Sequence, residues 1–181
     1  MTPALPLLLC IDLQPAFLAA IPDSQRVHWR CSFALEVAKG LDLPVIFTEQ
    51  VPAKLGGTAE DLLALAPKAA VFGKDSFSAL ADKAVVAQLK AKGSNQILIC
   101  GIETPVCVYQ TARDAMLAGC EVTLLIDCLG ARRSDDAAAV LAQLRHAGGK
   151  VLPAESVFYS LLRDAKHPFF RDYTKLVKKY G

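Results

Sequence analysis

The sequence predicts an α/β fold, a three-layer α/β/α arrangement around a doubly wound, mainly parallel sheet of six strands. Short apolar runs alternate with segments of helical spacing along the whole chain, and glycines separate several helical segments from the next run. The 181 residues are 53% hydrophobic and 21% charged, which suits one domain spanning residues 1–181 with a sizeable core. Repeated strand–helix–strand units imply right-handed crossovers, with helices on both faces of the sheet.

Six apolar runs are typical of strands that are buried on both faces of a sheet. They are Leu7–Ile11, Pro44–Thr48, Ala69–Phe72, Gln96–Cys100, Glu121–Ile126 and Lys150–Leu152. The first run belongs to the N-terminal segment MTPALPLLLCIDL, which has no basic start and is interpreted as a strand, not a signal peptide. None of the runs approaches the ~18 apolar residues that span a bilayer, so no membrane association is expected.

Apolar residues three and four positions apart predict the helices. The helical segments are Val27–Lys39, Leu80–Lys92, Val106–Ala118 and Ser134–Ala147, with a last helix expected within Pro168–Gly181. A glycine follows each of the first four, where a left-handed residue is expected: Gly40, Gly93, Gly119 and Gly148. The longest irregular stretch is Gln50–Leu65, in which Thr58 is a candidate cap for a short helix.

Composition argues against several function classes. The 20 basic and 18 acidic residues give a net charge of +2, which makes no electrostatic case for nucleic acid or an acidic membrane surface. The first strand leads into neither a G-x-G-x-x-G motif nor a P-loop, so no nucleotide cofactor is expected. The six cysteines form no C-x-x-C pair and are predicted to be free thiols in a reducing, cytoplasmic compartment.

Three reactive side chains follow predicted strands at the edge where open parallel sheets bind ligands. Asp12 ends the first strand, Lys74 follows the third, and Cys107 lies just past the fourth. Each also has an ordinary explanation: a turn cap, a solvated surface charge, and a small apolar residue in a helix. Their coincidence at one edge is what makes them candidates for catalysis.

The segment around Cys107 strengthens its candidacy. Thr104 is a plausible N-cap and Pro105 suits the first helical position, which puts Cys107 in the first turn of a helix. Unpaired N–H groups and the helix dipole favour an anion there, and a nearby cation would lower the pKa of the thiol. The same N–H groups could hold an oxyanion, although a Thr104 hydroxyl bonded to the Cys107 amide would compete with that role.

Four motifs in register resemble the isochorismatase-like cysteine hydrolases. They are Ile11–Phe17 (IDLQPAF), Phe47–Pro52 (FTEQVP), Gly73–Ser78 (GKDSFS) and Gly101–Val108 (GIETPVCV), the last followed by Thr111 and Ala112. The resemblance covers nearly the whole chain. Through T-E-Q and the Ser156…His167-Pro168 tail, the chain is most similar to the subgroup of isochorismatase domain-containing proteins.

The resemblance implies a catalytic triad of Asp12, Lys74 and Cys107. It also implies a cis peptide bond between Ile102 and Glu103, with the N–H groups of Glu103 and Cys107 forming an oxyanion hole. Asp12 would deprotonate the thiol, which would attack an amide-type carbonyl to give a thioester that water hydrolyses. No organic cofactor is implied.

Some residues of this chain differ from the pattern of related enzymes, and these differences limit the reactions that we expect. The metal-binding nicotinamidase branch has an Asp-x-His pair and a further histidine, whereas this chain has T-E-Q-V-P there and only His28, His146 and His167 elsewhere. No catalytic metal is therefore expected, which also argues against nicotinamide as substrate. Isochorismatases that hydrolyse a vinyl ether do not need a cysteine nucleophile, so Cys107 favours acyl chemistry, although vinyl-ether hydrolysis remains an alternative.

The residues expected to line a small, largely apolar substrate pocket are Phe17, Gln50, Phe77, Pro105 and Val106. Ordinary loop packing is the alternative role for Phe77 and Gln50. The expected partner is a small-molecule substrate, and the high apolar content together with the resemblance favours a homo-oligomer. A binding or scaffold protein that keeps the hydrolase fold without catalysis is the other alternative.

Overall fold

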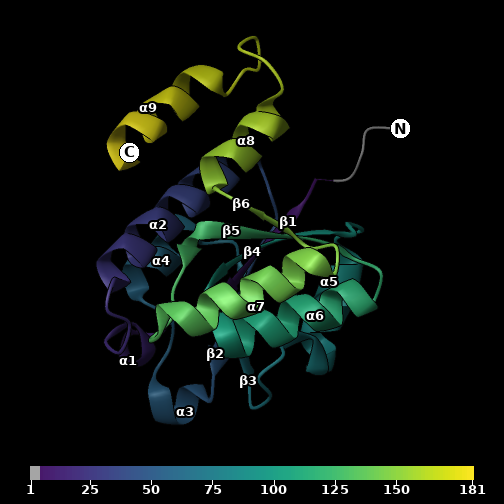
Figure 1. Cartoon of the computed structure of the whole chain (residues 1–181). Coiled ribbons are helices and arrows are strands. Elements are labelled where there is room, and N and C mark those ends of the chain that lie inside the picture. The colour runs from purple at the N-terminus through teal and green to yellow at the C-terminus, as the bar shows by residue number, and fades with distance from the viewer. Residues whose placement is uncertain (1–4) are drawn as a thin grey trace.

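The computed structural model describes residues 5–181 as a six-stranded sheet between two layers of helices (Figure 1). The strand order is β3-β2-β1-β4-β5-β6 and every pair is parallel, so the chain starts in the middle of the sheet and winds outwards in both directions. The predicted fold class is confirmed. Residues 1–4 of the N-terminal segment interpreted as a strand lie outside the described residues.

The predicted strands are all present. They are β1 (Leu7–Ile11), β2 (Val45–Gln50), β3 (Ala70–Lys74), β4 (Gln96–Gly101), β5 (Glu121–Leu129) and β6 (Lys150–Leu152). Full burial holds for β1, fails at Ile126 of β5, which is exposed, and is wrong for β3 and β6. These two are the edge strands, so Val71 and Leu152 point to the surface.

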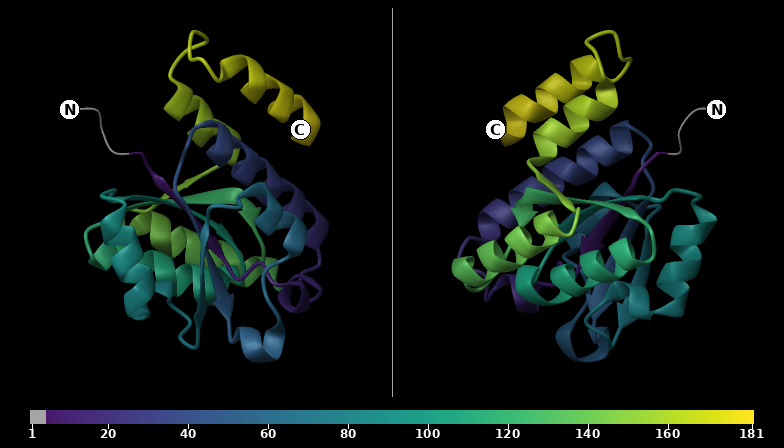
Figure 2. Two further views of the ribbon diagram at one scale, coloured as in Figure 1. Left: turned by 180° about the vertical axis from the view of Figure 1, so that it is seen from behind. Right: turned by 45° about the vertical axis from the view of Figure 1, so that its right-hand side comes forward.

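Helices cover both faces of the sheet (Figure 2). One layer contains α2 (Ser24–Gly40), α4 (Glu60–Leu65), α8 (Ala154–Leu162) and α9 (Phe170–Tyr180). The other contains α5 (Lys83–Ala91), α6 (Tyr109–Leu117) and α7 (Ser134–His146). Shorter turns lie between them: α1 (Pro15–Leu18), α3 (Pro52–Leu55), a 3₁₀ turn (Ala79–Ala81) and a π-helical turn (Thr104–Val108).

Strand β1 shows how the sheet separates two hydrophobic cores. Leu8 and Cys10 pack in the core beneath α2, whereas Leu7, Leu9 and Ile11 pack in the core on the other face. This alternation follows from the two-residue period of a strand. Because both faces of β1 are buried, this central strand holds its carboxyl end in a fixed place, at the edge of the sheet where the parallel strands end.

Two turn predictions are wrong. Gly93, Gly119 and Gly148 have positive φ as predicted, but Gly40 ends α2 and the left-handed residue is Asp42, with φ of 57°. Gly40 is instead suited to packing, because a Cβ there would overlap the Phe169 ring. Thr58 is not a helix cap either; its hydroxyl and its backbone N–H both donate to the Glu49 carboxylate.

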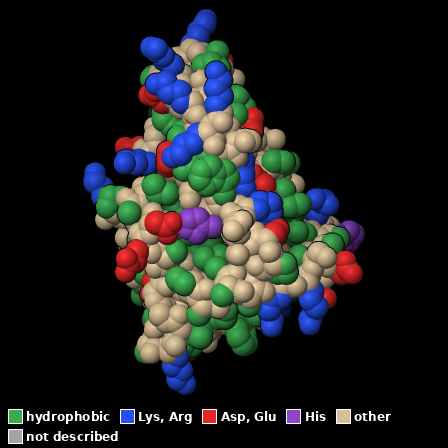
Figure 3. Space-filling model, turned by 90° about the vertical axis from the view of Figure 1, so that its left-hand side faces the viewer, with side chains coloured by type: hydrophobic (Ala, Val, Ile, Leu, Met, Phe, Trp, Pro, Cys, Tyr) green, Lys and Arg blue, Asp and Glu red, His purple; other side chains and the backbone are tan. Residues whose placement is uncertain are grey.

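Lysine and arginine side chains on the face that carries α2 and α9 are most frequent at the α8–α9 end of the molecule (Figure 3). Helix α9 itself ends in Lys178 and Lys179, which suit the negative end of the helix dipole. Within residues 5–181, no helix combines the length and the apolar character needed to cross a bilayer.

Candidate active site

Asp12 lies directly after β1, where the chain turns sharply. Its φ of 51° is in the left-handed region, which aspartate tolerates better than most residues. Its backbone N–H donates to the Thr48 carbonyl oxygen at 3.1 Å, and the Thr48 hydroxyl donates to Oδ1 at 2.8 Å. The carboxylate is thereby fixed at the sheet edge, and Asp12 is only 1% exposed.

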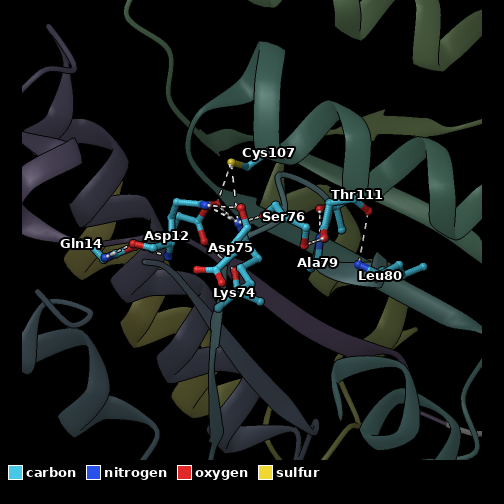
Figure 4. Close-up of polar contacts among 12 residues, drawn as sticks. Asp12, Gln14, Lys74, Asp75, Ser76, Ala79, Leu80, Cys107 and Thr111 are labelled. Atoms are coloured by element: carbon cyan, nitrogen blue, oxygen red, sulfur yellow. Dashed lines mark hydrogen bonds and ion pairs between the residues drawn. The ribbon is translucent and has the colours of Figure 1, made fainter. Parts of the chain in front are cut away.

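Lys74 is the last residue of β3, and its side chain is fully buried. Its Nζ donates to Asp12 Oδ2 at 2.8 Å, to Gln50 Oε1 at 2.6 Å and to the Ser76 carbonyl oxygen at 3.2 Å (Figure 4). Together with a longer contact to Cys107 Sγ at 3.7 Å, these acceptors share the three N–H bonds of the ammonium. The alternative of a solvated surface lysine is therefore wrong.

Cys107 lies in the π-helical turn that leads into α6 and is 6% exposed. Its Sγ is 3.7 Å from Lys74 Nζ and 4.0 Å from Gln50 Oε1. Strands β1 and β3 and the turn after β4 thus bring the carboxylate, the ammonium and the thiol together. Their separation in the sequence is large, but the parallel sheet places all three at one edge.

The electrostatics of Cys107 differ from the sequence prediction. Burial and the nearby Asp12 carboxylate raise the pKa of the thiol to about 12, and the Lys74 ammonium offsets only part of this increase. The prediction of a lowered pKa is wrong because a first-turn position does not compensate for loss of solvent and a neighbouring negative charge. The thiol is protonated at neutral pH, so a thiolate forms only if its proton is transferred.

The segment before Cys107 is held by the neighbouring loop. The Ile102–Glu103 peptide bond is cis, as the resemblance implied. Thr104 was expected to cap the helix, but its hydroxyl donates to the Gly130 carbonyl oxygen at 2.7 Å, and Glu103 occupies the N-cap position. Thr104 therefore does not compete for the Cys107 amide. The Glu103 carboxylate accepts from the backbone N–H and Nε of Arg132, at 2.9 and 2.6 Å.

A cavity of about 280 Å³ opens in front of the thiol. It is lined by Asp12, Phe17, Ala20, Ile21, Gln50, Phe77, Ile102, Glu103, Val106, Cys107 and Arg132. The structure thus brings Phe17, Gln50, Phe77 and Val106 to the triad, as predicted. Pro105 is a correction, because it lines a separate hollow beside Arg133. This hollow adjoins the cavity, and Glu103, Val106 and Arg132 line both.

Sequence reasoning missed part of this lining. Ile21 lies four residues after Phe17, a spacing that could have placed both side chains on one side of a helical turn. Arg132 follows β5, so the rule that ligands bind at carboxyl ends of strands could have included it. No sequence signal identified Gln50 as a direct partner of the Lys74 ammonium, because that contact arises from the pairing of β2 with β3.

Comparison with known proteins agrees with this geometry. A family profile described as the isochorismatase domain matches residues 6–156. The chain belongs to the isochorismatase family. Isochorismatase domain-containing protein 2A of Mus musculus is 34% identical over 174 residues, which are 96% of this chain and 82% of that protein. Isochorismatase domain-containing protein 2 of Danio rerio is 36% identical over 172 residues, 94% and 85% of the two chains.

Solved structures share the fold. The MAR1 ribonuclease of Caenorhabditis elegans superimposes with a TM-score of 0.91 at 28% identity, covering 98% of this chain and 91% of that one. The YcaC protein of Escherichia coli, described as an octameric hydrolase of unknown specificity, gives 0.85 at 24% identity, covering 98% and 93%. The second likeness concerns the fold alone.

The histidines of this family member lie away from the cavity lining. His28 Nε2 pairs with Asp61 at 2.9 Å, and His167 Nδ1 accepts from the Phe169 backbone N–H. Within residues 5–181, no group of three or more histidine, cysteine, aspartate or glutamate side chains has the arrangement of a metal site.

The cysteines are free thiols, as predicted. Besides Cys107, the buried ones are Cys10, Cys31, Cys100 and Cys128, and Cys120 is half-buried. Burial is the main cause of the raised pKa of Cys10 and the only cause at Cys120. Cys107 is the one thiol among them that lines the cavity beside Asp12.

Proposed function

We propose that this isochorismatase-family protein is a cysteine-dependent hydrolase that cleaves a C–N bond of a small amide through a thioester on Cys107. The observation that carries the proposal is the shielded Asp12–Lys74 ion pair beside the thiol, with side-chain exposures of 1% and 0%. Burying two charges costs more free energy than their attraction commonly returns. Their position against a thiol in a cavity therefore favours a role in catalysis over a role in stability.

The first step is a coupled transfer of the proton. Asp12 accepts the proton of the Cys107 thiol as Sγ attacks the carbonyl carbon. Because the resting thiol has a pKa of about 12, the protonated thiol is favoured before substrate binds, and the proposal therefore couples the proton transfer to attack. The Lys74 ammonium lowers the free energy of the thiolate that develops 3.7 Å away.

The later steps use the same groups. The tetrahedral oxyanion is stabilised by the backbone N–H groups of Glu103 and Cys107. Asp12 then gives its proton to the departing amine, and the C–N bond breaks to leave a thioester. A water molecule that Asp12 deprotonates attacks this thioester, and the C–S bond breaks to release the carboxylic acid. Asp12 passes the proton of the water to the departing Sγ, which restores the thiol and the carboxylate. The net reaction adds one water to one amide.

The cavity supports a compact acyl group. Phe17, Ile21, Phe77 and Val106 supply an apolar wall, and about 280 Å³ is small for a ligand site. Apolar walls favour an aliphatic or aromatic acyl chain by the hydrophobic effect. The charged residues of the cavity lining are Asp12 and the Glu103–Arg132 ion pair.

The name of one solved relative raises RNA as a second substrate class. Single-stranded nucleic acid is bound by basic grooves that follow the phosphates and by aromatic stacking platforms. Here the basic side chains of α9 lie at the other end of the molecule from α1, which borders the cavity (Figures 1 and 3). Arg132, the cation of the lining, is paired with Glu103. These observations favour a small amide over RNA.

Two alternatives remain distinguishable from amide hydrolysis. A vinyl-ether hydrolase would not need a nucleophilic thiol, and would keep its activity without Cys107. A binding or scaffold protein would form no acyl adduct with any substrate. The buried ion pair disfavours the scaffold role, since a protein without catalysis gains nothing from two desolvated charges at this edge.

Assembly into a homo-oligomer is part of the proposal. It is supported by the octameric relative and by large exposed apolar side chains, among them Trp29, Leu117 and Tyr159. Light scattering coupled to size-exclusion chromatography measures the mass directly, and a mass equal to one 19.4 kDa chain would contradict this part of the proposal.

Acyl-enzyme trapping tests the proposed reaction. The protein is incubated with a panel of short aliphatic and aromatic primary amides, quenched in acid and digested for mass spectrometry. The expected result is an acyl mass on the Cys107 peptide, accompanied by ammonia release. Cys107→Ser should lose the thioester, while Cys100→Ser, which changes a buried thiol outside the cavity, should keep it. Turnover without any adduct, retained in Cys107→Ser, would overturn the proposal.

A further inference from the structure

Gln14 lies beneath the candidate active site, and the mechanism does not use it. It follows Asp12 by two positions and is fully buried. Its Oε1 accepts from the Gln50 backbone N–H at 2.6 Å. Its Nε2 donates to the carbonyl oxygens of Gln50 at 3.1 Å and of Gly56 at 2.6 Å. The whole side-chain amide is therefore used to hold the backbone of another segment.

The hydrogen bonds from the Gln14 side chain to the backbone of Gln50 and Gly56, here called the Gln14 clamp, begin where the pairing of β1 with β2 ends. The β1–β2 register ends at Ile11 and Thr48, because the chain turns away from the sheet at Asp12. Gln50, two residues further along β2, is beyond this last pair but still faces the β1 side. The Gln14 amide both accepts from and donates to the Gln50 backbone, as a neighbouring strand would.

The side chain of Gln50 contacts the groups that the proposed mechanism uses, so the position of its backbone affects theirs. Its Oε1 accepts from Lys74 Nζ at 2.6 Å and lies 4.0 Å from Cys107 Sγ. Its Nε2 donates to the Asp75 carbonyl oxygen at 2.9 Å, which fixes which end of the amide faces the ammonium. A shift of the Gln50 backbone would therefore move an acceptor that holds Lys74 against Asp12 and Cys107.

A strained residue stands inside the clamped segment. Val51 has φ of 42° and ψ of 59°, a left-handed conformation that is rare for a β-branched residue. Such conformations persist only where the surroundings hold them. Gln14 binds the residue before Val51 and Gly56 after it, so its amide spans the strained position.

We propose that Gln14 is a positioning residue of this active site, acting through the Gln50 backbone to keep the Lys74 ammonium next to the Cys107 thiol. The inference rests on the proposed function. Because Lys74 lowers the pKa of Cys107, loss of the clamp raises that pKa further and slows every reaction that needs the thiolate.

Alkylation of Cys107 by iodoacetamide reads this effect without any substrate. The rate at Cys107 is measured peptide by peptide relative to Cys120, a half-buried thiol outside the cavity lining that serves as internal standard. Gln14→Met keeps the length and removes the hydrogen bonds. We expect it to slow Cys107 relative to Cys120 by roughly threefold to tenfold, equivalent to an upward pKa shift of about half a unit to one unit. Lys74→Met should shift the ratio in the same direction.

Epistasis distinguishes positioning from general destabilisation. If Gln14 acts through Gln50, the double variant Gln14→Met/Gln50→Met should alkylate no more slowly than Gln50→Met alone. Leu162→Ala, a buried substitution in α8 outside the cavity lining, should lower stability and leave the Cys107/Cys120 ratio unchanged. Multiplying effects in the double variant, or an equal change in Leu162→Ala, would overturn the proposal.

A second Gln14 variant and a comparison with the acyl-adduct experiment complete the test. If Gln14→Met does not fold, Gln14→Asn retains the amide but is too short to reach Gln50 and Gly56 together, and a ratio equal to that of the parent protein would contradict the positioning role. Failure of the proposed function gives a different result. It would show as an absent acyl adduct on Cys107 while the alkylation ratios of the Gln14 variants still change.

Discussion

Cys100 and Cys107 belong to one continuous segment, the first in β4 and the second in the turn that follows it. Both are buried and both have a raised pKa. Cys100 faces the Cys10 thiol at 3.5 Å inside the core beneath α2. Cys107 instead faces the Asp12–Lys74 pair and a cavity. The hydrogen bond with Cys10, together with burial, raises the pKa of Cys100, whereas burial and the Asp12 carboxylate raise that of Cys107. Of these two thiols, only Cys107 lies beside a carboxylate and an open cavity.

The largest expected effect is the difference in amide turnover between variants that lack one or the other of these two thiols. Cys107→Ala should reduce amide turnover by about 10⁴-fold or more, because no other group in the cavity can form the thioester. Cys100→Ala should keep turnover within about threefold, since its thiol has no contact with the reacting atoms. Initial rates on the amide that gives the acyl adduct measure both, and circular dichroism verifies that each variant is folded. Equal losses in the two variants would remove the distinction.

The next effect concerns the base. Asp12→Asn keeps the size of the side chain but removes the group that accepts the thiol proton. Turnover should fall by roughly 10²–10⁴-fold, the usual contribution of general acid–base catalysis. Steady-state kinetics should locate the loss in kcat rather than KM. Retention of more than a tenth of the parental kcat would show that another base is used.

Stability provides a third effect. Lys74→Met leaves the Asp12 carboxylate buried without its cation, which should lower the free energy of unfolding by about 3–5 kcal/mol. Adding Asp12→Asn should recover much of this loss, because the unpaired charge is then gone. Lys68→Met, an exposed lysine before β3, should change stability by less than about 0.5 kcal/mol. Urea unfolding of five proteins, the parent, Lys74→Met, Asp12→Asn, the double variant and Lys68→Met, measures these differences. Additive losses in the double variant would contradict this explanation.

A null effect is expected from metal removal. The chain lacks the histidine motif of the metal-binding branch, and His28 and His167 are engaged in contacts outside the cavity lining. Incubation with a chelator followed by desalting should leave turnover unchanged, and elemental analysis should find no stoichiometric zinc or iron. Loss of activity that added metal restores would overturn the argument from the histidines.

The sequence predicted what depends on local pattern and parallel topology. Apolar runs located each strand, and the rule for carboxyl ends of strands brought Asp12, Lys74 and Cys107 to one edge. Whether a run lies in the centre or at the edge of the sheet depends on strand order, so the exposure of Val71 was missed.

Tertiary contacts decide what the sequence could not predict. The raised pKa of Cys107 arises from burial and from Asp12, whereas a first-turn argument considers only the helix that contains the thiol. The Gln14 clamp is invisible in the IDLQPAF motif, because its partners are Gln50 at the end of the next strand, β2, and Gly56 in the loop after it.

The pH dependence of Cys107 alkylation in Asp12→Asn and Lys74→Met tests most directly the claim that these two charges control the thiol. In the parent protein the rate should keep rising with pH through the alkaline range, because the thiol pKa is about 12. Asp12→Asn removes a negative charge that raises this pKa, so its midpoint should move down toward the ordinary thiol value; Lys74→Met removes the charge that lowers it, so its midpoint should move up. Opposite shifts, with Cys120 unchanged, are the predicted result. Midpoints equal to that of the parent protein in both variants would contradict the assignment of Asp12, Lys74 and Cys107 as one catalytic unit.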